Sequence, residues 1–471
     1  MDTKKLRQKI LDLAIRGKLV PQDPNDEPAS VLLERIRAEK ERLIKEGKIK
    51  RSKKSASDTP HYENVPYDLP EGWEWQKLGD IGTWQSGATP SRLNKDYYGG
   101  DIPWLKTGDL NDDYIYEIPE TITQKALEET SVKLNPAGSV LIAMYGATIG
   151  KVGILTFPAT TNQACCACVD YQGIEKMYLF YFLLSHKEEF IMLGGGGAQP
   201  NISKEKIVDT FIPIPPLLEQ NRIVNAIEQW FYLIDTLETA KEDLKTSIEH
   251  AKSKILDLAI HGKLVPQDSN DEPAIELLKR INPKFSPCDN AHDTNQLPDS
   301  WCWSTLGDVC SFISGYSYSS SEYKKAGIPL VRISDINDGI ISLDNCAYIQ
   351  PQGERNVYLQ KGDILIAMSG ATTGKMGIYM NEESAILNQR VGVVRVTDSK
   401  IISEKYRDYF LYRKSSDILK LAYGGAQPNI SGKMICSLLL PLPPYSEQLR
   451  IVAKIEELFA VFDEIQKSIE A

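Results

Sequence analysis

"KILDLAIRGKLVPQDPNDEPA" at residues 9–29 returns as "KILDLAIHGKLVPQDSNDEPA" at residues 254–274. A second block, "GGAQPNIS", stands at residues 196–203 and again at 424–431. The copies of the first block lie further apart than the copies of the second, so the two halves of the chain are not in simple register. Each half is much longer than a solenoid repeat, and the chain is therefore a tandem duplication of a large unit.

The segment between residues 217 and 260 contains no glycine or proline and predicts one long helix. Its apolar positions alternate in steps of four and three, which is the period of a coiled coil. Gly262 and Pro266 follow as a stop signal. Forty-odd residues at about 1.5 Å each make a rod of roughly 60 Å. The apolar seam of this helix consists of Ile223, Ile227, Trp230, Ile234, Leu237, Leu244, Ile248, Ala251, Ile255 and Leu258.

The same helix begins again near residue 445, but the chain stops at residue 471. Its missing end corresponds to residues 1–16, which repeat the end of the central helix. We therefore expect residues 445–471 and 1–16 to build one composite helix that packs antiparallel to the central one. The two chain ends would then meet, in a circular arrangement with a pseudo-two-fold axis.

The remainder of each half is rich in Trp, Tyr, Gly and Pro and has short apolar runs such as "SVLIAM" (139–144) and "FIPIP" (211–215). These runs predict strands, with one short helix near "EKMYLFYFLLSH" (175–186) and its counterpart. The predicted fold class is α/β, with two similar globular domains separated by two long antiparallel helices. The predicted segments are a distal helical region at 1–36, a first globular domain at 60–216, a central helical region at 217–282, a second globular domain at 286–444 and the rest of the distal region at 445–471.

The composition suits a globular protein, with 42% hydrophobic and 25% charged residues. No apolar run is long enough to span a membrane, and the polar N-terminus does not resemble a signal peptide, so a cytoplasmic location is expected. The net charge is −10, yet residues 35–54 hold ten Lys and Arg against three Glu. This run is either a solvated helix face and linker or a contact to a phosphate backbone.

Cys165, Cys166 and Cys168 cluster in "NQACCACVD", which invites interpretation as a metal site. The second half has Val391, Gly392 and Val394 in the same segment. Because metal ligands cannot be exchanged for valine and glycine when both halves do the same work, we expect these cysteines to be small apolar residues on a buried strand. No metal ligands are predicted.

The search for catalytic motifs gives none. "GATIGKV" (146–152) has too few residues between its glycines for a phosphate-binding loop, and valine follows the lysine where Ser or Thr should bind magnesium. "PIPP" (213–216) lacks the leading Asn or Asp of a base-methylating site. No catalytic residues are therefore predicted. What remains is one scaffold carrying two divergent loop sets, which favours two recognition modules.

In its whole length the sequence resembles the specificity subunits of type I restriction-modification systems. The resemblance lies in the order of domains and helices, in "GGAQPNIS" leading to "PxPPxxEQxRI", and in "KILDLAIxGKLVPQ" at the helix ends. It implies a non-catalytic DNA-binding subunit in which each recognition domain recognises one half of a bipartite target. It also implies that the helices set the spacer and bind two modification subunits, and that two restriction (motor-nuclease) subunits complete the complex.

The same resemblance implies no cofactor in this chain, with S-adenosylmethionine, ATP and Mg expected in the partner subunits. The expected ligand is double-stranded DNA, and no membrane contact is expected. Polar, aromatic and basic loop residues are the predicted DNA contacts. In the first domain these are Ser86, Thr89, Ser91, Arg92, Lys95, Tyr97, Lys106, Tyr145, Thr148 and Lys151. In the second they are Tyr316, Ser317, Tyr318, Ser319, Lys324, Arg332, Ser369, Thr372, Lys375 and Arg390.

Two other functions remain open at this point. One is the specificity subunit of a methylation-only complex, which uses the same chain without a motor partner. The other is a coiled-coil adaptor that binds protein through both globular domains.

Overall fold

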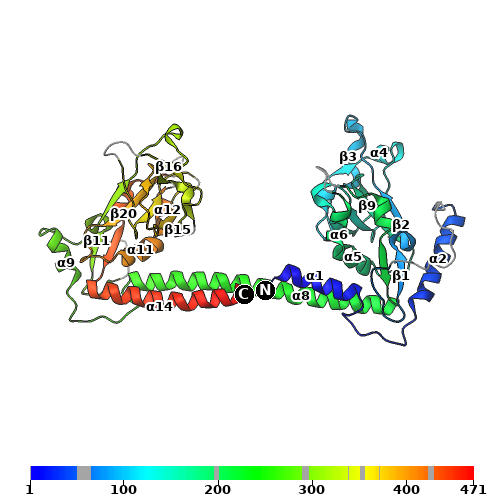
Figure 1. The fold of residues 1–471 in the computed structure, drawn as a ribbon, viewed down its shortest axis with the longest axis horizontal. Helices are drawn as coiled ribbons and strands as arrows, with labels where there is room; N and C mark the ends of the chain where they lie inside the picture. Colours follow the sequence, from blue (N-terminus) through cyan, green and yellow to red (C-terminus); the bar gives the residue numbers. More distant parts are fainter. Residues whose placement is uncertain are drawn as a thin grey trace. The chain divides into compact units, whose positions relative to one another are not determined.

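The computed structural model describes residues 2–49, 65–195, 201–288, 296–337, 339–350, 356–370, 372–422 and 429–470. Most of both "GGAQPNIS" blocks and the end of the basic run, residues 50–54, lie outside these ranges. The chain divides into two compact units, Met1–Ala240 and Lys241–Ala471. Each unit combines a globular domain with part of the long helix α8 and a second helix beside it (Figure 1).

The long helix α8 spans Leu217–Ile260, the bounds that the sequence predicts. Gly262 beyond it has a φ of +64°, as expected of a terminating glycine. In unit 1 the first part of α8 packs against α1 (Thr3–Ile15) (Figure 1). Arg7 contacts Asp235 at 2.6 Å, whereas Gln22, just after α1, reaches back to Glu219 at the start of α8. The two helices are therefore antiparallel.

In unit 2 the last part of α8 packs against α14 (Tyr445–Glu470) (Figure 1). Lys252 Nζ lies 2.6 Å from Asp463, and Gln267 Nε2 lies 2.7 Å from Glu447, so this pair is antiparallel as well. Each half of the predicted helix pairing is thus found within its own unit. That the chain ends meet stays a prediction.

The predicted apolar seam of α8 is wrong at Trp230, Leu237 and Leu244, which are about half exposed. In unit 1 the buried face instead takes in Val224, and Phe231 stacks edge-on against Tyr181 of the globular domain. The physical reason is that α8 buries its apolar surface against α1 and the domain together, so its buried face is wider than a two-helix seam and rotated away from Trp230.

The described part of the globular domain of unit 1 contains three sheets. Five strands are ordered β2-β9-β6-β7-β4, three are ordered β5-β3-β8, and β1 pairs with β10. All pairs are antiparallel except β4 with β7 and β3 with β8. The strands are β1 Glu74–Lys77, β2 Gly82–Ser86, β3 Tyr98–Leu105, β4 Asp113–Ile115, β5 Thr121–Ile122, β6 Val140–Ala143, β7 Val152–Leu155, β8 Thr160–Thr161, β9 Cys165–Asp170 and β10 Phe211–Ile214. The helices are α2 Ala29–Lys45, α3 Leu78–Ile81, α4 Gln124–Glu129, α5 Lys176–Ser185, α6 Lys187–Leu193 and α7 Lys204–Val208, with short 3₁₀ turns η1 Lys95–Tyr97, η2 Thr107–Asp109 and η3 Gly146–Thr148.

Unit 2 repeats this plan. Its sheets are ordered β12-β20-β17-β18-β15-β14, β16-β13-β19 and β11-β21. The strands are β11 Cys302–Thr305, β12 Cys310–Ser314, β13 Ile328–Val331, β14 Ile336–Asn337, β15 Gly339–Ile341, β16 Ala347–Ile349, β17 Ile364–Ala367, β18 Met376–Ile378, β19 Ile386–Leu387, β20 Val391–Val396 and β21 Leu439–Leu442. The helices are α9 Ala274–Ile281, α10 Leu306–Val309, α11 Glu404–Arg413, α12 Ser415–Ala422 and α13 Gly432–Cys436, with turns η4 Ser320–Glu322 and η5 Ile333–Asp335.

The short predicted elements are confirmed. "SVLIAM" contains β6, "FIPIP" contains β10, and the short helix after residue 175 is α5. The clustered cysteines lie on β9 and are all buried, and burial raises the pKa of each thiol, which keeps the thiols neutral. They pack as small apolar residues.

The described part of the basic run belongs largely to α2, whose Leu32, Leu33 and Ile36 are buried. Lys40 on this helix pairs with Asp80 at 2.9 Å. Much of the run is therefore an amphipathic helix on the domain surface. Among the described residues, no helix is both long and apolar enough to cross a membrane.

The corrected buried face leads to a stability prediction. Ile227→Ala should lower the free energy of unfolding by about 2–5 kcal/mol, because Ile227 is only 1% exposed and its loss leaves a cavity. Leu233→Ala on the same helix should cost less than about 1 kcal/mol, because Leu233 is 50% exposed. Urea denaturation followed by circular dichroism measures both, and equal costs would contradict this assignment of the buried face.

Candidate nucleic-acid interface

The divergent loops of the two domains leave the scaffold at the same point. Gly87 follows β2, and a Cβ there would lie 2.1 Å from the Thr161 carbonyl oxygen. Gly315 follows β12, and its Cβ would lie 2.1 Å from the Leu387 carbonyl oxygen. Only glycine fits such a close backbone approach. The two loop sets therefore differ in sequence but start from the same position on the sheet.

In unit 1 the loop after Gly87 is organised around Arg92. The guanidinium of Arg92 lies 4.3 Å from the ring of Tyr98 and 5.1 Å from that of Trp104. It also pairs with Glu120, whose other oxygen accepts from Lys106 at 2.9 Å. The hydrogen bonds from Arg92 and Lys106 hold the pKa of Glu120 below its usual value. The structure thus brings two predicted DNA contacts together on one carboxylate.

The other predicted residues of this loop are placed around that cluster. The Thr89 hydroxyl donates to the side chain of Gln163, and the Tyr97 hydroxyl donates to Glu129 at 3.1 Å. Ser91 and Lys95 are exposed, and Ser86 is partly buried at the end of β2. Ser91 and Lys95 are therefore accessible to a ligand, whereas Tyr97 already has a partner within the domain.

Tyr145, Thr148 and Lys151 lie together in the turn between β6 and β7. Thr148 Oγ1 donates to the Tyr145 carbonyl at 2.9 Å, and Lys151 Nζ donates to the Leu110 carbonyl at 3.3 Å. The backbone of Tyr145 bridges to Asn201 near the end of the repeated block. Thr148 and Lys151 thus hold the turn in shape, while Tyr145 is partly exposed.

The corresponding turn of unit 2 carries Ser369, Thr372 and Lys375. Ser369 bridges to Asn429, just as Tyr145 bridges to Asn201. Thr372 Oγ1 is buried and makes no hydrogen bond to a described atom, while Lys375 is exposed. Both domains therefore hold the described end of "GGAQPNIS" against the same turn.

The long loop of unit 2 makes different contacts from its counterpart. The Tyr318 hydroxyl donates to Asn356 at 2.7 Å, and the Ser319 backbone N–H donates to Glu322 at 2.6 Å. Arg332 pairs with Asp335 at 3.4 Å and donates to the Asn345 carbonyl at 3.1 Å. Tyr316, Ser317, Lys324 and Arg390 are exposed. Unit 2 therefore has a paired arginine of its own, Arg332, together with an exposed tyrosine and two exposed cations, Tyr316, Lys324 and Arg390.

Sequence reasoning missed several residues of this surface. Leu93 is 97% exposed at the tip of the first loop. Gln163 and Gln389 are exposed beside the two divergent loops. The dipeptide Asn-Gln occurs in both halves at this point, and that repetition was the available signal. No sequence signal marks Glu120, because only the tertiary fold places it between Arg92 and Lys106.

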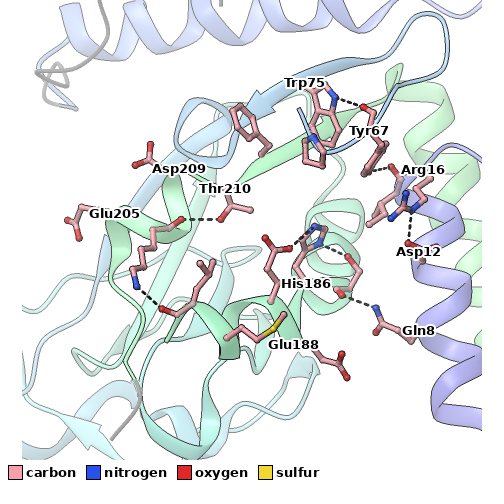
Figure 2. Close-up of a pocket in the computed structure, with 18 residues that line it drawn as sticks. Gln8, Asp12, Arg16, Tyr67, Trp75, His186, Glu188, Glu205, Asp209 and Thr210 are labelled. Atoms are coloured by element: carbon pink, nitrogen blue, oxygen red, sulfur yellow. Dashed lines mark hydrogen bonds and ion pairs between the residues drawn. The ribbon is translucent and has the colours of Figure 1, made fainter. Parts of the chain in front are cut away.

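A pocket of about 740 Å³ lies elsewhere in unit 1, between α1, α6, α7 and β10 (Figure 2). None of the predicted DNA contacts lines it. Five carboxylates and the two cations Arg16 and Lys206 are among its lining residues, and burial lowers the pKa of His186, which keeps that ring neutral. The carboxylates are Asp12, Glu188, Glu189, Glu205 and Asp209. The lining of this pocket has more carboxylates than cations, which makes it a poorer site for phosphate than the loops.

Comparison with known proteins agrees with the two-domain arrangement. The model of the family "Type I restriction modification DNA specificity domain" matches residues 70–246 and 298–471. The specificity subunits of the type I restriction enzymes EcoAI and EcoEI of Escherichia coli are each 28% identical to this chain. The alignments cover 98% and 99% of the chain and 90% and 91% of those proteins.

Two solved structures share the fold. One belongs to a study of complex assembly and conformational transition of the type I R-M system, with a TM-score of 0.60, 21% identity and coverage of 86% of this chain and 94% of that one. The other is a crystal structure of the HsdS subunit from Thermoanaerobacter tengcongensis, with a TM-score of 0.51, 20% identity and coverage of 86% and 93%.

The carboxylate between Arg92 and Lys106 leads to a binding prediction. Glu120→Gln should raise the affinity for duplex DNA roughly threefold to tenfold at low salt, because it releases two cations and removes a charge that repels phosphate. The dependence of affinity on salt should also become steeper. Fluorescence anisotropy with a labelled duplex at several salt concentrations measures both quantities.

The matched control is Glu128→Gln, because Glu128 is an exposed carboxylate on α4 that contacts neither cation. It should leave the affinity within about twofold. If Glu120→Gln behaved like this control, Arg92 and Lys106 would not face the DNA.

Proposed function

The chain belongs to the family of type I restriction-modification DNA specificity domains, and on that premise we propose that it is the non-catalytic subunit that selects the DNA target of such a complex. Each globular domain binds one half of a bipartite sequence in double-stranded DNA. The observation that carries this proposal is the pair of loop sets that start from equivalent glycines, Gly87 and Gly315, yet make different contacts. One scaffold with two different contact surfaces suits two different half-sites.

The chemistry of the loops supports a division of labour. Arg92, whose guanidinium lies over the rings of Tyr98 and Trp104, is a planar donor suited to guanine O6 and N7. Tyr316, Lys324 and Arg390 supply other donors in unit 2. Lys151 recurs as Lys375, so we assign this position to the sugar-phosphate backbone, which both half-sites share. Thr148 and Thr372 recur as well, but the Thr148 hydroxyl donates within its own turn and the Thr372 hydroxyl is buried. The remaining predicted contacts are part of the same proposal.

The helices set the distance between the half-sites in this proposal. DNA rises by about 3.4 Å per base pair, and an α-helix rises by about 1.5 Å per residue. The continuity of α8 from Leu217 to Ile260 supports this assignment, because a helix without a break has a defined length. The central and distal helical regions therefore act as the spacer element, at 217–282 and at 445–471 with 1–36.

The same helices carry an apolar face suited to partner subunits. Trp230 and Leu233 of α8 are about half exposed, and so is Val461 of α14, which occupies the position equivalent to Leu233. Exposed apolar side chains at matching places in two units fit a partner that binds twice. We assign this face to two modification subunits, which bring S-adenosylmethionine. Two restriction subunits would bring the ATP- and Mg-dependent motor, and the assembly would work in the cytoplasm.

Exchange of one recognition domain tests the proposal most directly. Replacing residues 69–212 with the matching segment of a relative should change one half of the methylated sequence and leave the other half and the spacer unchanged. Sequencing of methylated DNA from cells that carry the hybrid complex measures this. The control is the same exchange of residues 297–440, which should change only the other half. A simultaneous change of both halves in either hybrid would rule out one domain per half-site.

The partner face gives a second prediction. Leu233→Asp combined with Val461→Asp should abolish co-purification of the modification subunit, because a charge on each helix opposes burial of the apolar face. The denaturation midpoint of the isolated chain should change little, since both side chains are exposed. Leu218→Asp, also exposed on α8, is the control and should leave assembly intact. Normal assembly of the double variant would place the partner elsewhere.

A further inference from the structure

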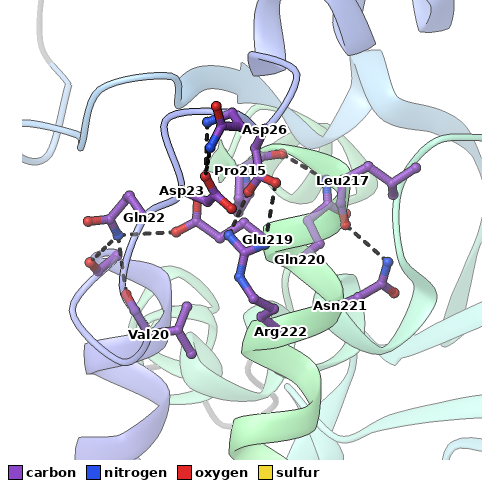
Figure 3. A network of polar contacts seen from close by, with 12 residues as sticks. Val20, Gln22, Asp23, Asp26, Pro215, Leu217, Glu219, Gln220, Asn221 and Arg222 are labelled. Atoms are coloured by element: carbon purple, nitrogen blue, oxygen red, sulfur yellow. Dashed lines mark hydrogen bonds and ion pairs between the residues drawn. The ribbon is translucent and has the colours of Figure 1, made fainter.

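A buried carboxylate joins three separate parts of unit 1 at the start of α8. Glu219 is 1% exposed, and each of its two oxygens accepts one hydrogen bond. Oε2 accepts from Trp73 Nε1 at 3.0 Å, and Trp73 immediately precedes the first strand of the recognition domain. Oε1 accepts from Gln22 Nε2 at 3.1 Å, in the segment that follows α1 (Figure 3). One side chain of the long helix thus holds both the domain and the neighbouring helix segment.

The residues beside Glu219 continue the same junction. Gln220 Oε1 accepts from the Glu175 backbone N–H at 2.8 Å, where α5 of the recognition domain begins. Arg222 pairs with Asp26 at 2.5 Å (Figure 3). In this Glu-Gln-x-Arg sequence, Gln220 therefore contacts the domain, Arg222 contacts the segment after α1, and Glu219 contacts both. These contacts restrain rotation as well as separation of the two bodies.

Unit 2 repeats the junction with the corresponding atoms. Glu447 is 0% exposed, and it accepts from Trp301 at 3.0 Å on Oε2 and from Gln267 at 2.7 Å on Oε1. Gln448 accepts from the Ser403 N–H at 2.8 Å, and Arg450 pairs with Asp271 at 2.6 Å. The recognition loops of the two units differ, but this junction does not.

Glycine completes the fit in each unit. Gly17, just beyond α1, has a φ of +64°, and a Cβ there would lie 2.4 Å from Pro70 and 3.2 Å from Trp73. Gly262 has the same φ, and its Cβ would lie 2.4 Å from Pro298 and 3.3 Å from Trp301. The recognition domain therefore sits directly on the end of the helix, with no room for adjustment on that side.

A buried carboxylate is an expensive way to hold packed surfaces together. Burial raises the pKa of both Glu219 and Glu447, against the hydrogen bonds that lower it, so the ionised form is held at a cost. An apolar side chain would fill the same space without that cost. What the carboxylate adds is direction, because two oxygens fix two N–H donors that come from different bodies.

We propose that Glu219 and Glu447 are positioning residues that fix the orientation of each recognition domain on its helix and so restrict the complex to one spacer length. This inference rests on the proposed function, because spacer selection has meaning only for a bipartite target. The loops decide which bases are bound, and the helix decides how far apart the domains can be. The junction at Glu219 or Glu447 keeps each domain in one orientation on its helix, so that the distance between the domains stays fixed.

Replacement by glutamine is the sharpest perturbation, because it keeps the size of the side chain. In Glu219→Gln one oxygen becomes an NH₂ group that faces an N–H donor of Gln22 or Trp73. Gln22 cannot rotate its amide to compensate, because its NH₂ group also donates to the Gly17 carbonyl at 2.8 Å. One of the two hydrogen bonds is therefore lost, and the junction loosens without a cavity.

The experiment uses the chain assembled with its modification subunits and a plasmid library that holds both half-sites at the native spacer and at one or two base pairs more or less. Sequencing of methylated DNA gives the spacer profile and the base preference at each half-site. The wild-type complex should methylate the sites that have the native spacer. Glu219→Gln and Glu447→Gln should each raise methylation at sites with a longer or shorter spacer, relative to sites with the native spacer, about tenfold. The base preference at each half-site should stay unchanged. Glu242→Gln, at an exposed position of α8, is the control and should keep the wild-type profile.

The outcomes distinguish a failure of the proposed function from a failure of the positioning role of Glu219 and Glu447. If the wild-type complex methylated no bipartite site, the proposed function would fail. If wild type did so and both glutamine variants kept a single spacer, or lost activity equally at all spacers, the positioning role would fail while the function stood. Should the variants not fold, Asp26→Asn and Asp271→Asn remove the partly exposed ion pair of each junction and decide by the same criterion.

Discussion

Each unit depends on two hydrogen bonds that a buried carboxylate accepts in the first turn of a long helix. Glu219 and Glu447 connect a tryptophan of the recognition domain with a glutamine beyond the neighbouring helix, and each oxygen has one partner. Because the donors come from different bodies, the bonds fix an orientation that apolar packing alone would leave free to slide. The loops of each domain keep one orientation relative to the long helix as long as these bonds hold.

The charges of the protein are distributed unevenly over its surface. The whole chain carries a formal charge of −10, and unit 1 has a pocket lined by five carboxylates. Yet Arg92 and Lys106 gather on one side of the first domain, where Glu120 compensates part of their charge. Such pairing holds the guanidinium of Arg92 close to the rings of Tyr98 and Trp104 in the absence of DNA. A protein of this net charge can bind DNA in a selected place without attracting it over its whole surface.

The long helices carry apolar side chains on a buried side and also on an exposed side. Their buried side packs against a helical neighbour and against the recognition domain, which is why Phe231 and Val224 are covered while Trp230 is not. Their exposed apolar side chains remain at equivalent positions in both units, as Leu233 and Val461 illustrate. A strict heptad pattern describes neither surface fully, because the helix packs against two neighbours rather than one.

The sequence by itself determined the duplication, the bounds of the long helix, strands with a clear apolar run such as β6 and β10, and the buried cysteines, because each depends on local periodicity or on comparison of the two halves. It also named Arg92 and Lys106 as candidate DNA contacts. Only the tertiary structure decided that Glu120 lies between them, that Trp230 is exposed, and that Glu219 meets both Trp73 and Gln22. These contacts join residues far apart in the chain, and no local pattern encodes which distant side chain will face a given carboxylate once the helices and sheets have packed.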